Sequence, residues 1–164
     1  MRREIRKEKL GIRKQRTRIK YKTGFRHQLW KDTETQTEVY PNADIITRYV
    51  ELYKNGWLIV KFGYPWDGPS GPCRLIADRL PKWFQKKYLK RILRGSLFHD
   101  ALSELMRRGF LSEIWLAQTD KELKRICLED KMYRIRAWWV YKAVQMAGGS
   151  YTSPKNKRKI LTAP

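Results

Sequence analysis

The segment that most constrains the fold is TRYVELYKNGWLIVKFGY, which is rich in β-branched and aromatic residues and carries Asn55-Gly56 near its centre. Asn-Gly is a favoured pair for a two-residue type I′ turn, because both of its central positions need positive φ angles. The segment therefore predicts a β-hairpin with strands at 47–54 and 57–63.

A two-residue turn also sets which side chains lie opposite each other. It places Leu52 opposite Ile59 and Val50 opposite Lys61, and these pairs share one face of the hairpin. The other face carries Tyr49, Tyr53, Leu58, Val60 and Phe62. Because this second face is the more apolar, we expect it to pack on the core.

The hairpin is flanked by two segments of different character. A polar, Thr-rich stretch at 33–38 precedes residues 39–42, which resemble a short strand entering a turn. The stretch GYPWDGPSGP at 63–72 is too rich in Gly and Pro for regular structure, so we expect an ordered loop.

Helical periodicity begins after the loop. Apolar residues from Pro81 to Ile92 predict one helix, and a second helix is expected from about Ser96 to Arg108, closed by Gly109.

The last helix has its own boundary signals. Thr119 and Glu122 form a T-x-x-E capping box, and Gly148-Gly149 supplies a stop, which together predict a helix over 120–147. Asp130 interrupts the apolar stripe of this helix.

These elements predict an α+β fold, with a small antiparallel sheet or hairpin followed by a Gly/Pro-rich loop and a three-helix C-terminal part. A chain of 164 residues suits one domain. We expect a basic arm at 1–22, a single domain at 23–149 and a basic tail at 150–164.

Charge indicates the kind of partner. The net charge is +21, and residues 1–20 hold ten basic and two acidic side chains. This charge predicts an anionic partner, of which nucleic acid is the commonest. An anionic membrane surface and an acidic protein are alternative partners. Alternatively, the charge only keeps the chain soluble. The candidate anion-binding residues are Arg2, Arg3, Arg6, Lys7, Arg13, Lys14, Arg16, Arg18, Lys155, Lys157, Arg158 and Lys159.

The cysteines and the hydropathy exclude other classes. Cys73 and Cys127 lack the CxxC spacing of a metal knuckle, so free thiols are expected. No apolar run approaches the ~20 residues of a membrane span. Motifs of P-loop proteins, zinc peptidases and serine hydrolases are absent from the sequence.

One helical turn gathers residues capable of chemistry. His99 precedes Asp100 in SLFHDALSEL, and on a helix it shares a face with Ser96 and Ser103. An imidazole with an ordinary pKa near ~6.5 suits a general base or a metal ligand. The alternative is a structural pair on a helix surface.

The order of motifs resembles a phage and prophage family of unknown function, domain of unknown function thirteen fifty-three, over residues 45–149. That family shows an Asp-Gly-Ala-Ser-x-Pro loop, a His-Asp helix, an Ala-Asp pair and a late tyrosine. The matching positions here are Asp67, Gly68, Ser70, Pro72, His99, Asp100, Asp120 and Tyr141. Pro69, Ser103 and Thr119 depart from the pattern.

The resemblance implies a phage-encoded protein, in the host cytoplasm or the virion, with a clustered polar site. The candidate catalytic residues are His99, Asp100, Asp120 and Ser70. Asp67 and Asp100 are the candidate ligands of a divalent cation, the one cofactor considered. Alternatively, these carboxylates bond backbone N–H groups and hold the loop on the helices.

Two functions remain open from the sequence. The first is a virion-associated or accessory protein whose basic arm and tail bind nucleic acid or another phage protein, aided by aromatics among basic residues, as in KWFQKKY at 82–88. The second is a small His-Asp hydrolase acting on an anionic substrate. The oligomeric state is not predicted.

Overall fold

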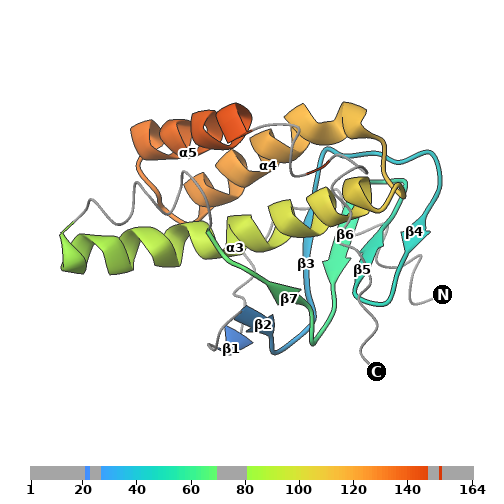
Figure 1. Ribbon diagram of the computed structural model, residues 1–164, viewed down its shortest axis with the longest axis horizontal. Helices are drawn as coiled ribbons and strands as arrows, with labels where there is room; N and C mark the ends of the chain where they lie inside the picture. Colours follow the sequence, from blue (N-terminus) through green and yellow to red (C-terminus); the bar gives the residue numbers. More distant parts are fainter. Residues whose placement is uncertain (1–20, 23–26, 70–80, 148–151, 153–164) are drawn as a thin grey trace, which may run out of the picture.

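The computed structural model describes residues 21–22, 27–69, 81–147 and 152. The smaller of two antiparallel sheets lies on one side of a long helix, α3, and two shorter helices, α4 and α5, lie on its other side, while the larger sheet packs at the second half of α3 (Figure 1). The predicted α+β fold with a three-helix C-terminal part is confirmed. Residues 1–20 of the predicted arm (1–22), and all of the predicted tail (150–164) except residue 152, lie outside the described residues.

The larger sheet has the strand order β3-β6-β5-β4. Its strands are β3 (Thr33–Gln36), β4 (Ile45–Ile46), β5 (Val50–Leu52) and β6 (Trp57–Val60). The smaller sheet has the order β1-β2-β7, with strands β1 (Tyr21–Lys22), β2 (His27–Leu29) and β7 (Pro65–Trp66). β1 thus includes the two residues that the sequence assigns to the end of the arm.

The hairpin is confirmed, but its turn and register differ from the prediction. Tyr53 N donates to Trp57 O at 2.9 Å and Gly56 N donates to Tyr53 O at 2.8 Å, so the loop has three residues. Only its last residue, Gly56, has a positive φ, at 78°, as in a turn closed by a glycine bulge. The type I′ turn predicted from Asn55-Gly56 is therefore wrong.

The extra loop residue shifts the pairing by one position. Val50 lies opposite Val60 and Leu52 opposite Leu58, and all four side chains are buried. The predicted core face is confirmed for Leu58 and Val60 on the second strand, whereas Phe62 is exposed. It is wrong for the first strand, where Val50 and Leu52 are buried in place of Tyr49 and Tyr53, because a one-residue slip exchanges the faces of a strand. Burying all four aliphatic side chains together favours the observed register.

The strand preceding the hairpin is also displaced from its predicted position. No strand forms at 39–42; instead the Thr-rich stretch forms β3, in which Thr33 and Thr35 are buried and alternate with half-buried neighbours. A threonine fits a strand because its branched Cβ suits the pleated surface.

The two helices predicted on either side of Gly95 are a single helix, α3 (Lys82–Arg107). A Cβ on Gly95 would lie 2.8 Å from Leu123 Cδ1 on α4, so this glycine permits a close helix contact and does not end the helix. The predicted end at Gly109 is confirmed: its φ is 78°, and its N–H donates to the Met106 carbonyl.

The single helix predicted over 120–147 is instead two helices, α4 (Leu116–Glu129) and α5 (Arg134–Ala147). Between them Lys131 has a φ of 62°, Lys131 N donates to Leu128 O, and Met132 N donates to Cys127 O. This is a Schellman ending whose left-handed residue is not a glycine, so no sequence signal marked it.

The predicted capping box is wrong as well. Thr119 and Glu122 both lie inside α4 and are buried. A short 3₁₀ helix (Glu113–Trp115) precedes α4, and the Ser112 hydroxyl accepts from Ile114 N at its start. Glu122 instead accepts a hydrogen bond from Glu38 N at 3.0 Å, which ties α4 to the segment after β3.

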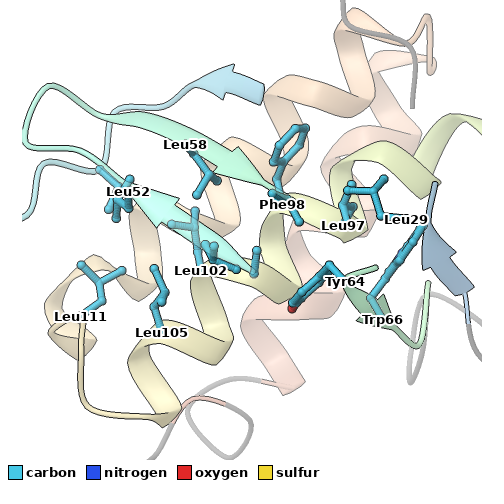
Figure 2. Close-up of a cluster of buried hydrophobic side chains, with 14 of the residues drawn as sticks. Leu29, Leu52, Leu58, Tyr64, Trp66, Leu97, Phe98, Leu102, Leu105 and Leu111 are labelled. Carbon is cyan, nitrogen blue, oxygen red and sulfur yellow. The ribbon is translucent and has the colours of Figure 1, made fainter. Parts of the chain in front are cut away.

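α3 connects two hydrophobic cores. Its second half packs on the sheets through Leu97, Phe98, Leu102 and Leu105 (Figure 2). Its first half packs on α4 and α5. The residues of that second core are Tyr88, Ile92, Leu123, Cys127, Met132, Ala137, Val140 and Ala143. Because the sheets cover only one half of α3, the other half carries a helical layer alone (Figure 1).

Cys127 is a buried free thiol, as predicted, and Cys73 lies outside the described residues. In the described part of the chain, the structure shows no helix that combines the length and apolarity required to cross a membrane.

Candidate functional site

The histidine and aspartates that the sequence singles out meet where α3 packs against α4. His99 lies in the second half of α3, and its Nε2 is 2.9 Å from Oδ1 of Asp120 on α4. Its Nδ1 is 3.8 Å from Oδ1 of Asp100. The imidazole side chain is 17% exposed and Asp120 is buried. These residues therefore form one polar cluster that links the two helices, which we name the His99 cluster.

The His99 cluster sets the charge of the imidazole. Burial works to lower the pKa of His99, but the hydrogen bonds and charges of Asp100 and Asp120 outweigh burial and raise it from 6.5 to about 9. At neutral pH the ring is therefore an imidazolium. A general base has to accept a proton near its working pH, so the geometry suits an ion pair or a proton donor better than the predicted general base.

The loop residue Asp67 lies within electrostatic range of this cluster. Burial raises the pKa of Asp100, the hydrogen bond and charge of His99 lower it, and the negative charge of Asp67 adds to the rise; the net direction is upward. The next residue, Gly68, lies against the imidazole of His27 on β2. A Cβ on Gly68 would also lie 3.7 Å from Leu93 Cδ1, so this part of the loop lies beside α3.

The two candidate metal ligands, Asp67 and Asp100, are carboxylates of the kind that divalent cations prefer. Among the described residues, however, no group of three or more His, Cys, Asp or Glu side chains has an arrangement that could hold a metal ion. A cation held by these two carboxylates stays a prediction.

Glu104, which the sequence places on the same helix face as Asp100, borders the His99 cluster together with Tyr64 and Arg107, two residues that the sequence did not indicate. The buried phenol of Tyr64 has its pKa raised by burial first, and then by the charges of Glu104 and Asp100 and a hydrogen bond to Glu104; Arg107 lowers it. Tyr64 comes from the sheet side, and no local motif could have placed it beside Glu104, which lies 40 residues later in the chain.

The two serines on the helical face of His99 and the late tyrosine of the resemblance have the following surroundings. Ser96 Oγ donates to the Leu93 carbonyl at 2.8 Å. Ser103 is buried, and its Oγ has no hydrogen-bond partner among the described residues. Tyr141 on α5 accepts a hydrogen bond from Gln145. Ser70 and Pro72 lie outside the described residues, as do all the arginines and lysines predicted for the arm and tail.

A second surface, which the sequence showed only in part, lies on the helical layer. The first half of α3 and all of α5 carry basic side chains and no carboxylate. Arg94 is buried; the exposed or half-buried basic residues are Lys82, Lys86, Lys87, Lys90, Arg91, Arg134, Arg136 and Lys142. We name them the cationic face. The sequence indicated the part on α3, at 82–88. It did not indicate the part on α5, because it joined α5 to α4 in one long helix.

Aromatic rings connect the two helices of the cationic face. The guanidinium of Arg136 lies 3.8 Å from the ring centroid of Phe84 on α3, and that of Arg91 lies 5.8 Å from the ring of Tyr133. Arg91 and Phe84 lie on the same side of α3, because Lys87 is three residues from one and four from the other. Lys87 therefore projects from that side as well.

The nearest carboxylates on α4 are held by other arginines. The buried Arg94 donates to Asp130 at 3.0 Å and to Glu129 at 2.9 Å. Arg125 pairs with Glu122 and Glu129. The structure shows no ion pair for any basic residue of the cationic face within the described ranges. Their charge is therefore available to an external anion.

Comparison with known proteins adds no relative to the description of the His99 cluster and the cationic face. No family model, no curated protein and no solved structure matches the chain, so the resemblance to a phage family stays a prediction.

Proposed function

We propose that this protein binds nucleic acid through the cationic face of α3 and α5, with the basic arm and tail adding phosphate contacts. The observation that carries the proposal is that the first half of α3 and all of α5, which meet where Arg136 lies over the ring of Phe84, carry eight exposed or half-buried basic residues and no carboxylate. It suits the accessory or virion-associated phage protein that the sequence resemblance implies, acting in the host cytoplasm or the virion.

The physical basis is the release of counterions. A lysine or arginine that neutralises a phosphate releases a condensed cation, so binding is strong at low salt and independent of base sequence. Ion pairs within the protein would compete with this interaction. Because Arg94 and Arg125 hold the carboxylates of α4, the lysines and arginines of the face meet no such competitor there.

The distribution of acidic groups supports binding of nucleic acid at the first half of α3. Four carboxylates lie near the second half of α3, at the end of the helix opposite to Lys82. They are Asp67, Asp100, Glu104 and Asp120. A nucleic acid is attracted to the first half of α3 and repelled from the second. The alternative, a hydrolase at His99, would have to use an imidazole whose pKa Asp100 and Asp120 raise above its ordinary value, which disfavours the ring as a general base.

The test measures the salt dependence of DNA binding by the full chain. The face variant replaces Lys87 and Lys142 with glutamine; the control replaces Lys31 and Lys54, two exposed lysines on the sheet side, and has the same net charge. Each lost phosphate contact reduces the slope of log K against log salt by about 0.9 on duplex DNA.

We expect the face variant to reduce this slope by between about 1 and 2, while the control leaves it unchanged. An equal effect of both variants would mean that only net charge matters, and would contradict the assignment of the face. Wild-type protein that does not bind at low salt would refute the function itself. Replacing Arg2, Arg3, Arg6 and Lys7 with glutamine should reduce the slope independently of the face.

A further inference from the structure

We propose that α5 makes this protein selective for single-stranded nucleic acid, because the bases of a single strand can stack on Trp138 and Trp139. This inference rests on the proposed function and specifies its ligand. It concerns the aromatic part of the surface, whereas the proposed function concerns its charge.

The two tryptophans are placed on the outside of the helical layer. Trp138 is 42% and Trp139 is 54% exposed, while Ala137 and Val140 on the same helix are buried in the core. The two indole rings lie 5.2 Å apart between centroids at an angle of 77°, edge to face. Adjacent exposed indoles are uncommon on a soluble protein surface unless they bind something.

Basic residues lie on both sides of these rings. Arg134, Trp138 and Lys142 follow one another at intervals of four, so they form a line along the exposed side of α5. Lys142 Nζ lies 6.0 Å from the centroid of the Trp138 ring. A ring between two cations matches a strand in which bases and phosphates alternate, because the base contacts the indole while the phosphates contact the basic groups.

The charge of this surface decides between the candidate ligands. In a duplex the faces of the bases are covered by their neighbours, so an indole on a helix surface has only phosphate and sugar to contact. A second copy of the chain in a symmetric pair would bring Arg134 and Lys142 against their own counterparts, with no carboxylate on α5 to offset the repulsion. Single-stranded nucleic acid supplies both a negative charge and free aromatic faces.

The experiment compares a fluorescein-labelled oligothymidylate with a duplex of the same length, by fluorescence anisotropy at one salt concentration. One double variant replaces Trp138 and Trp139 with leucine, which keeps an apolar side chain but removes the π-face. A second replaces both with phenylalanine, which keeps a π-face. The control is Trp30→Leu, since Trp30 is 49% exposed and packs edge to face on Phe62 at the sheet side.

We expect the leucine pair to weaken oligothymidylate binding by about tenfold or more, with duplex binding unchanged, and the phenylalanine pair to retain most of the affinity. Trp30→Leu should change neither. Quenching of tryptophan emission by oligothymidylate should disappear in the leucine pair and persist in Trp30→Leu. Urea unfolding of each variant verifies that it is folded.

Three outcomes would overturn the inference while leaving the proposed function intact: equal affinity of wild type for both probes, equal loss for both probes in the leucine pair, or full affinity in the leucine pair. A change in sedimentation coefficient caused by the leucine pair, without a change in binding, would instead assign α5 to self-association and would also overturn it. Failure of both probes to bind wild type at low salt would refute the proposed function itself.

Discussion

Replacing His99 with glutamine should remove a pH-dependent contribution to stability. The pKa of His99 is raised from 6.5 to about 9 in the folded chain, against the action of burial, by Asp100 and Asp120. A tenfold change in proton affinity corresponds to about 1.4 kcal/mol, so the charged ring contributes about 3 kcal/mol to folding. Because the folded pKa is the higher one, this contribution is fully present below about pH 6.5 and is lost as the pH rises through about 9.

Glutamine is the informative replacement because its amide can still donate to Asp120 but cannot gain a proton. Urea unfolding of both proteins at several pH values gives the difference in unfolding free energy. We expect this difference to be about 3 kcal/mol larger near pH 6 than near pH 10. Titrations that the two proteins share, such as that of His27, cancel in the difference. A difference that does not change with pH over this range would refute the assignment of a charged His99, and an NMR titration of the ring would show the same directly.

Three substitutions test the packing. Gly56→Ala should destabilise the fold by at least about 1–2 kcal/mol in urea unfolding, because φ is positive and the new Cβ would lie 2.4 Å from Thr37 O; an unchanged midpoint would contradict the bulged turn. Arg94→Met should cost about 3 kcal/mol by the same measurement, since it removes the buried ion pair between Arg94 on α3 and Asp130; a loss under about 0.5 kcal/mol would show that water replaces the guanidinium. Phe98→Ala should cost about 3–5 kcal/mol in thermal or urea unfolding, because its ring is fully buried between α3 and the sheets, and a smaller loss would mean that the core collapses around the gap.

The candidate site was predictable where the residues are close in sequence and not where they come from different elements. His99 and Asp100 are adjacent on one helix, so their proximity needs no tertiary information. The contact of His99 with Asp120 depends on the angle at which α4 crosses α3, which Gly95 permits by its missing side chain. The raised pKa of His99 follows from that contact together with Asp100, so it could not be predicted from the sequence.

The sequence alone determined the hairpin around Gly56, the helical C-terminal part, the end of α3 at Gly109 and the large positive charge, because each depends on local backbone preference or on composition. The tertiary structure decided the register of the hairpin, the continuity of α3 and the division of the last helix at Lys131. In each case burial of apolar side chains in two cores outweighs a local signal: Val50 and Leu52 join Leu58 and Val60, and Met132 enters the second core only if the chain turns before α5. The same turn brings α5 back beside α4 and α3. The cationic face therefore combines two segments that are far apart in the sequence, so it could not be predicted from the sequence.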